Sequence, residues 1–152
     1  LPDNNMVIRQ RNNYKPTVDF FDLLKTNQIN TLTVCARAEL MKKLASRIEK
    51  EKLWFVYDHW FWLNIALKSK IRVFNEKMAN YRVHSQGVSS GNNFFKVRAP
   101  LVKFSSLITA LKQKNINKFK VVGAFIDLFF KMIRSRNSEA IGHIIRLNWF
   151  II

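Results

Sequence analysis

The order of apolar and polar positions predicts an irregular beginning, a mixed middle part and a helical end. Residues 1–18 are polar and show no sustained periodicity apart from the apolar run 6–8, so we expect an irregular segment with at most one strand. Asp19 has the position and the side chain of a helix N-cap before a short helix over 20–25. The alternating, β-branched run Thr31–Cys35 predicts a half-buried strand in which the cysteine is a small buried residue.

The middle part of the chain predicts two helices and two extended segments. A stripe of apolar residues at four-residue spacing predicts the first helix over 38–48. The stripe consists of Leu40, Leu44 and Ile48. Asp58 stands where an N-cap is expected before a second helix over 59–68, which is apolar nearly all round and should be buried between layers. Extended segments are expected at 71–74 and 78–83, ahead of a glycine-containing loop.

From Phe94 onward the pattern is helical, with apolar residues recurring at intervals of three and four. The two stretches are Leu101, Phe104, Leu107, Ile108 and Leu111, and then Val121, Val122, Phe125, Ile126, Phe129 and Ile133. The uncharged runs among them, 104–111 and 121–126, are far shorter than the ~20 residues that cross a bilayer. We therefore expect these helices to lie on a membrane if they meet one.

Composition and charge restrict the classes of function. The chain has 152 residues, 48% of them hydrophobic, which is enough for one domain to bury a core. Its net charge of +16 favours a polyanionic partner: an anionic membrane face, nucleic acid or a phosphate-bearing substrate. The single cysteine excludes an intrachain disulfide and a cysteine metal cluster, and fits a reducing cytosol. The chain begins at Leu1 without the layout of a secretion signal, so we expect a piece of a longer protein.

The candidate chemistry comes from motifs in a fixed order between residues 19 and 90. They are the approach segment Leu23-Leu24, Asn27-Gln28-Ile29 and Thr31-Leu32-Thr33-Val34, the helix start Tyr57-Asp58-His59-Trp60, the strand Lys70-Ile71 with the pair Asn75-Glu76, and finally Tyr81-Arg82-Val83-His84. This order resembles the acceptor half of the family 2 inverting glycosyltransferases with the GT-A fold. That family's pattern is an Asp at a helix start, an apolar helix, a Lys-Ile strand, an Asn-Glu pair and then Tyr-Arg-x-His.

The resemblance implies an α/β fold with few strands and many helices. Residues 1–92 would be the acceptor-side part of the glycosyltransferase domain, and 93–152 a helical, basic, amphipathic tail. It also implies that Asp58 is the general base that deprotonates the acceptor hydroxyl. The alternative is that Asp58 only caps its helix. The two roles are compatible, because a helix N-terminus stabilises an ionised carboxylate.

The resemblance assigns further residues to the site. His84 would add an imidazole to a divalent metal, Mn or Mg, but only together with the missing half of the enzyme, and the alternative is a hydrogen bond with neighbouring residues. Contacts with the acceptor or the diphosphate are expected from Thr31, Thr33, His59, Trp60, Arg82 and Ser89. All except Ser89 have a structural alternative: strand positions for the threonines, the exposed side of the helix for His59, a solvated strand end for Arg82, and the core for at least one of Trp60 and Trp62.

The sequence contains no Asp-x-Asp, and the nucleotide-binding half would precede Leu1. We therefore expect a portion of an enzyme that is inactive and binds no cofactor by itself. The complete enzyme would take a nucleotide sugar and a glycan or lipid-linked acceptor of the cell envelope or of a polysaccharide, in the cytoplasm, at the inner face of the membrane. Self-association would cover the sheet edge that the absent half would pair.

A different class of function also fits the composition. In this alternative the chain is a non-enzymatic basic module that binds anionic membrane or nucleic acid. Nucleic acid is the less favoured partner, because the sequence carries no recognised nucleic-acid-binding motif. A degenerate or purely structural remnant of an enzyme would keep the same core pattern.

Overall fold

In the computed structural model the described residues are 15–74, 76, 78–79 and 92–151, with the backbone alone described for 92–95 and 147–151. The described part is helix-rich and contains a single small sheet of two strands. Its elements are β1 (Thr17–Val18), α1 (Phe20–Lys25), the 3₁₀ turn η1 (Thr31–Thr33), α2 (Ala38–Lys50), α3 (Asp58–Ala66), β2 (Ile71–Arg72), α4 (Asn92–Leu111), α5 (Lys118–Arg134) and α6 (Ser138–Ile151).

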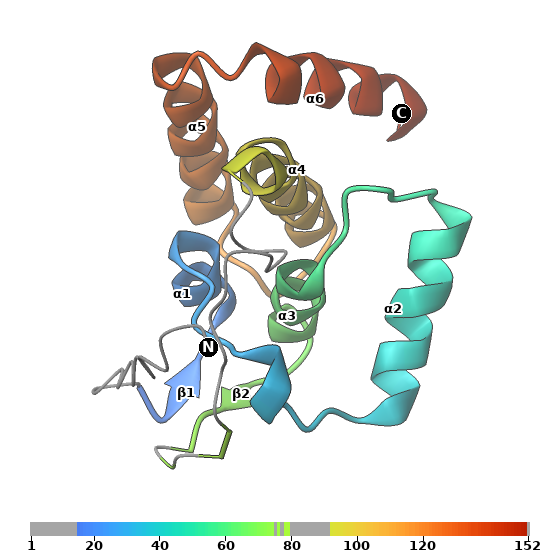
Figure 1. The fold of residues 1–152 in the computed structure, drawn as a ribbon, viewed down its shortest axis with the longest axis vertical. Helices are drawn as coiled ribbons and strands as arrows, with labels where there is room; N and C mark the ends of the chain where they lie inside the picture. The colour runs from blue at the N-terminus through green and yellow to red at the C-terminus, as the bar shows by residue number, and fades with distance from the viewer. Residues whose placement is uncertain (1–14, 75, 77, 80–91, 152) are drawn as a thin grey trace, which may run out of the picture.

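Helix α4 lies at the centre of the arrangement (Figure 1). It packs against α3, α5 and α6, while α1 and α2 pack against α3. One continuous hydrophobic cluster runs through these helices, from Leu23 of α1 and Leu63 of α3 to Leu107 of α4 and Val121 of α5, all fully buried. The expected helical end is thus confirmed, and its core residues are continuous with those of the first part. The proposed domain boundary at 92/93 stays a prediction.

The N-cap predicted at Asp19 of the short helix α1 is confirmed, and it forms part of a capping box. Asp19 Oδ1 accepts a hydrogen bond from the backbone N–H of Asp22 at 2.8 Å, and Asp22 Oδ2 accepts from the backbone N–H of Asp19 at 3.4 Å. Lys15 Nζ adds an ion pair to Asp22 at 2.7 Å. These contacts fix the chain direction directly after β1, whose residues pair antiparallel with those of β2.

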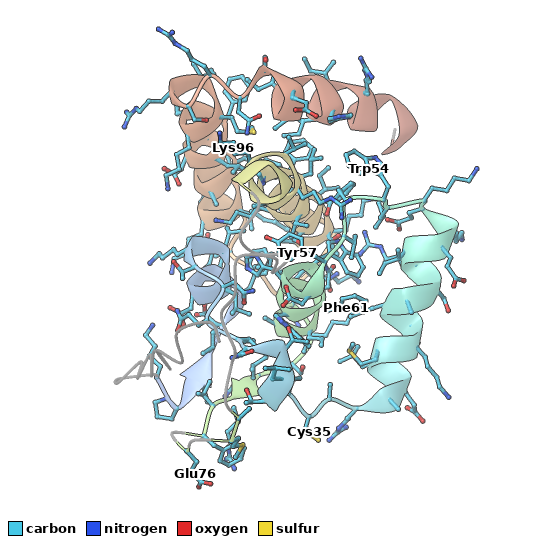
Figure 2. All side chains as sticks on the ribbon, viewed as in Figure 1. Cys35, Trp54, Tyr57, Phe61, Glu76 and Lys96 are labelled. Carbon is cyan, nitrogen blue, oxygen red and sulfur yellow. The ribbon has the colours of Figure 1, made fainter. Side chains whose placement is uncertain are left out.

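The strand expected at Thr31–Cys35 does not form. Residues 31–33 make a 3₁₀ turn, in which Asn30 Oδ1 accepts from the N–H of Leu32 at 3.4 Å and the Thr33 hydroxyl donates to the Asn30 carbonyl at 3.0 Å. A local asparagine cap competes with strand pairing for the same backbone groups, which explains the error. Cys35, expected to be buried, is exposed at the edge of the molecule (Figure 2).

The two helices of the middle part are confirmed with shifted ends. Helix α2 buries Leu44 and packs Leu40 and Ile48 at the rim of the core. Helix α3 is buried on nearly all sides, as its apolar sequence predicts. Its N-cap is Tyr57, so Asp58 is the first helical residue and not the cap. The strand expected at 71–74 is only the two residues of β2, and most of 78–83 lies outside the described residues.

Helix α4 contains Pro100 in its interior, and a side chain from another element compensates for it. Proline has no N–H, so the carbonyl four residues earlier, that of Lys96, loses its helical partner. The Nδ2 of Asn137, in the connection between α5 and α6, donates to this carbonyl at 2.6 Å. The Oδ1 of Asn137 also accepts from the N–H of Ala140 at 3.2 Å, at the start of α6. One asparagine therefore joins α4 to α6.

Within the described residues, no helix is both long enough and apolar enough to cross a membrane.

Candidate functional site

Two of the predicted site residues are in contact. The hydroxyl of Thr31, in η1, donates a hydrogen bond to Oδ2 of Asp58, at the start of α3. The two residues are separated by 27 positions in the sequence. The turn that replaced the expected strand therefore brings the approach segment to the aspartate.

The surroundings of Asp58 suit a carboxylate that accepts protons from a ligand. Its Oδ1 accepts from the backbone N–H of His59 at 2.6 Å. The carboxylate is half-buried in the first turn of the helix, where the helix dipole stabilises negative charge. Each carboxylate oxygen has two acceptor sites, and among the described residues these two bonds occupy one site on each. The alternative in which Asp58 only caps its helix applies in a modified way. Asp58 accepts from the N–H of the next residue, whereas an N-cap side chain accepts from an N–H two or three positions further along.

His59 is buried, contrary to its expected place on the exposed side of the helix. Its side chain is 2% exposed, and Nε2 lies 2.8 Å from the Leu23 carbonyl, to which it donates. Nδ1 lies 3.5 Å from the hydroxyl of Tyr57. Burial lowers the pKa of His59, and it also raises the pKa of Tyr57 to about 12, with a further contribution from the charge of Asp58. His59 thus ties α3 to α1 and does not face a ligand.

Trp60 belongs to the core and is not available to stack on a sugar. It is 0% exposed, its Nε1 donates to Ser105 Oγ at 3.1 Å, and the Arg47 guanidinium lies 5.4 Å from its ring centroid. Trp62 is buried as well, so the expectation that at least one of the two lies in the core is confirmed. Both tryptophans alternate with other large residues on a helix that has no polar face. The sequence therefore could not show which of these residues lie in the core and which at a site.

The remaining predicted site residues either lie only partly as expected or fall outside the described residues. Thr33 is exposed in the same turn as Thr31, but its hydroxyl bonds the backbone of Asn30. Arg82, His84 and Ser89 lie outside the described residues, so their assigned roles stay predictions. Among the described residues, no group of three or more His, Cys, Asp or Glu side chains is placed to hold a metal ion.

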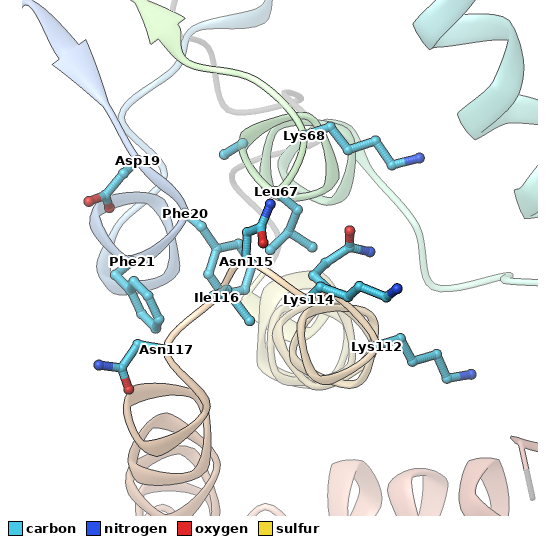
Figure 3. A pocket seen from close by; sticks show the side chains of 12 residues that line it. Asp19, Phe20, Phe21, Leu67, Lys68, Lys112, Lys114, Asn115, Ile116 and Asn117 are labelled. Carbon is cyan, nitrogen blue, oxygen red and sulfur yellow. The ribbon is translucent and has the colours of Figure 1, made fainter.

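Two hollows open elsewhere on the molecule. The first, of about 680 Å³, lies between the start of α1, the end of α3 and the α4–α5 connection, where Lys68, Lys112 and Lys114 lie to one side of Phe20 and Ile116 (Figure 3). The predicted site residues that the structure describes line neither this hollow nor the second one.

The second hollow gathers basic residues that the sequence motifs did not single out. It has a volume of about 920 Å³ and is lined by the first half of α4, the α5–α6 connection and Trp54. Its basic lining residues are Lys96, Arg98, Lys103 and Arg136. Burial lowers the pKa of Lys103, and the neighbouring charge of Lys131 lowers it further. The seven-residue spacing of Lys96 and Lys103 on one helix was the only sequence signal for this grouping.

Comparison of the chain with family models, with curated proteins and with solved structures finds no match.

Proposed function

We propose that the chain is the acceptor-side portion of an inverting, nucleotide-sugar-dependent glycosyltransferase with the GT-A fold, in which Asp58 is the general base. The observation that carries the proposal is the hydrogen bond between Thr31 and Asp58. Two motifs of the resemblance, far apart in the sequence, meet there on a half-buried carboxylate.

In the proposed mechanism the carboxylate of Asp58 takes the proton from the acceptor hydroxyl. That oxygen attacks the anomeric carbon from the face opposite the leaving nucleotide, so one base is sufficient. The Thr31 hydroxyl holds Oδ2, and the His59 N–H holds Oδ1, which fixes the plane of the carboxylate. A base held in this way loses little orientational freedom when the acceptor binds.

The proposed binding of the nucleotide-sugar donor depends on residues outside the described part of the chain. Arg82 and Ser89 would contact the diphosphate, and His84 would contribute to a Mn or Mg site completed by the donor-binding half. The described residues offer no ligand set for that metal, so no step here is assigned to it. The acceptor would be a glycan or lipid-linked acceptor of the cell envelope or of a polysaccharide, reached at the inner face of the membrane.

The test of this proposal uses the chain joined to its donor-binding half and a panel of labelled nucleotide sugars. Asp58→Asn should lower turnover by orders of magnitude and leave donor binding nearly unchanged, because a base acts in the transition state. Thr31→Val, which keeps the shape but removes the hydroxyl, should lower turnover by about tenfold, the effect of one lost hydrogen bond of ~1.4 kcal/mol. Thr31→Ser should retain most of the activity.

The matched control is Asp127→Asn, which makes the same chemical change on α5, where the carboxylate is exposed and paired with Lys131 at 2.8 Å. It should leave turnover unchanged. Wild-type turnover in Asp58→Asn would remove the catalytic assignment and leave a helix-terminal role for this residue. Absence of turnover with every nucleotide sugar of the panel would instead favour the non-enzymatic alternative, a basic module that binds anionic membrane or nucleic acid.

A further inference from the structure

Helix α5 has two apolar faces, and among the described residues only one of them packs into the core. Val121, Leu128 and Met132 are buried against the rest of the fold, and Phe125 packs edge-to-face on Phe104 of α4 with ring centroids 5.2 Å apart. At 3.6 residues per turn these positions share one side of the helix. The inner face therefore accounts for the packing of α5 on the core.

Next to this inner face α5 carries a second apolar stripe, which we call the outer stripe. It consists of Phe119, Val122, Ile126, Phe129, Phe130 and Ile133. All six are exposed, from 48% for Val122 and Ile133 to 91% for Phe119. By helix geometry they lie within an arc of roughly 100°. Figure 1 shows α5 at the edge of the molecule with α4 on its inner side.

Packing inside the molecule explains only part of the apolar pattern of α5. Packing on the domain explains Phe125, but Phe129 and Ile133, which have the same spacing, do not take part in it. Isolated exposed apolar residues are ordinary on a protein surface, whereas a continuous stripe of six along one helix marks an interaction surface.

The charges around the outer stripe indicate what covers it. Lys118, Lys120, Lys131 and Arg134 are exposed residues of the same helix, and Asp127 is its single acidic residue, already paired with Lys131. The whole chain carries a net charge of +16, so a second copy placed on this stripe would meet strong like-charge repulsion. An anionic surface meets attraction instead, and it also has an apolar interior for the six side chains.

We propose that the outer stripe of α5 is the surface by which this protein docks on the headgroup region of an anionic phospholipid membrane. The helix lies flat in the membrane interface, its three outer phenylalanines enter the boundary between headgroups and acyl chains, and the flanking lysines and arginine contact lipid phosphates. The inner face stays on α4, so docking needs no rearrangement of the core. This inference does not depend on the sugar-transfer reaction proposed above.

The test is co-sedimentation of the 152-residue chain with vesicles, with no sugar or nucleotide present. Vesicles of phosphatidylcholine mixed with phosphatidylglycerol should bind the chain, and binding should weaken as salt increases. The variant Phe130→Ser should weaken binding by about tenfold, and Ile126→Ser/Phe130→Ser on the order of a hundredfold, since each removes apolar area that the membrane would cover. Because both residues are exposed, neither change should disturb folding, which the circular dichroism spectrum checks.

The matched control is Phe74→Ser, because Phe74 is 61% exposed, the same fraction as Phe130, but lies after β2 and away from α5. It should bind vesicles like the unaltered chain. Equal loss in Phe74→Ser and Phe130→Ser would overturn the assignment of the stripe. So would binding to pure phosphatidylcholine at the same strength, or a dimer in lipid-free solution that Phe130→Ser dissociates.

Discussion

At the scale of single residues, the first turn of α3 places neighbouring side chains in different environments. Asp58 is half-buried and bonded to a hydroxyl, whereas His59 is buried and bonded to a backbone carbonyl. Tyr57, which precedes both residues, lies near the centre of the molecule (Figure 2). The sequence placed the aspartate correctly near a helix start. The sequence did not predict that His59 is buried, because on a helix without a polar face the pattern does not show which way a polar side chain points.

The buried imidazole of His59 predicts a dependence of stability on pH. Burial lowers the pKa in the folded protein below the value of 6.5 that the unfolded chain has, so the unfolded state binds more protons as the pH falls through that value. The free energy of unfolding should therefore decrease below about pH 6.5 and be insensitive to this group above it. Urea unfolding at a series of pH values measures this.

The variant His59→Gln serves as the control for this prediction, since glutamine retains a donor for the Leu23 carbonyl but does not titrate. Its unfolding free energy should change less between pH 7 and pH 5 than that of the unaltered chain. The same decrease in both proteins would assign the effect to other groups.

At the scale of elements, a polar network joins α2 to the core. Arg47 donates to Asn64 Oδ1 of α3 at 3.2 Å and to Thr109 Oγ1 of α4 at 2.9 Å. Asn64 is buried and donates in turn to the Trp60 carbonyl at 2.8 Å and to Ser106 at 3.3 Å. Helix α2 contributes only Leu44 to the fully buried core, so its position depends heavily on this arginine.

Replacement of Arg47 should loosen α2. Arg47→Ala should lower the free energy of unfolding by about 2 kcal/mol, because it removes hydrogen bonds to Asn64 and Thr109 and the contact with the Trp60 ring. Arg47→Lys should lower it by a similar amount, since an ammonium lacks the fork that reaches both partners. Lys43→Ala, an exposed change on the same helix, should have little effect in the same denaturant titration.

The contact between Asn137 and the Lys96 carbonyl predicts a coupling between two elements. Asn137→Asp keeps an acceptor for Ala140 but removes the donor to Lys96, and should lower the free energy of unfolding by about 1 kcal/mol. In Pro100→Ala the restored N–H supplies the partner that the Lys96 carbonyl lacks. Asn137→Asp should therefore be less harmful in that background. Purely additive effects in the double-mutant cycle would show that the contact contributes nothing to stability.

Elements were predictable where local signals agreed with the tertiary contacts. The N-cap at Asp19 and the stripe of α2 were both predicted from the sequence and both form. The strand at 31–35 was wrong, because β-branched residues favour a strand only when a partner strand is present, and Asn30 offered a local alternative. The contact between Thr31 and Asp58 followed from that turn and could not be derived from the strand.

At the scale of the whole molecule, periodicity predicted helices but not which of their faces would be buried. The apolar residues of α5 read as one amphipathic pattern, and in the structure they divide between the core side and the outer stripe. Which side faces inward depends on where α4 lies, and the sequence of α5 alone does not contain that information. The same holds for the basic residues around the second hollow, which α4 and the α5–α6 connection bring together.

The bond between Asn137 and Lys96 also sets an order of events during synthesis. A ribosome adds residues from the N-terminus, so the Lys96 carbonyl emerges 41 residues before the side chain that will bond it. Until then the partner of this carbonyl in the folded protein is absent from the nascent α4. The central helix reaches its final hydrogen bonding only when the connection to α6 has left the ribosome, so a chain stalled before Asn137 carries an α4 that is complete in sequence and unfinished in structure.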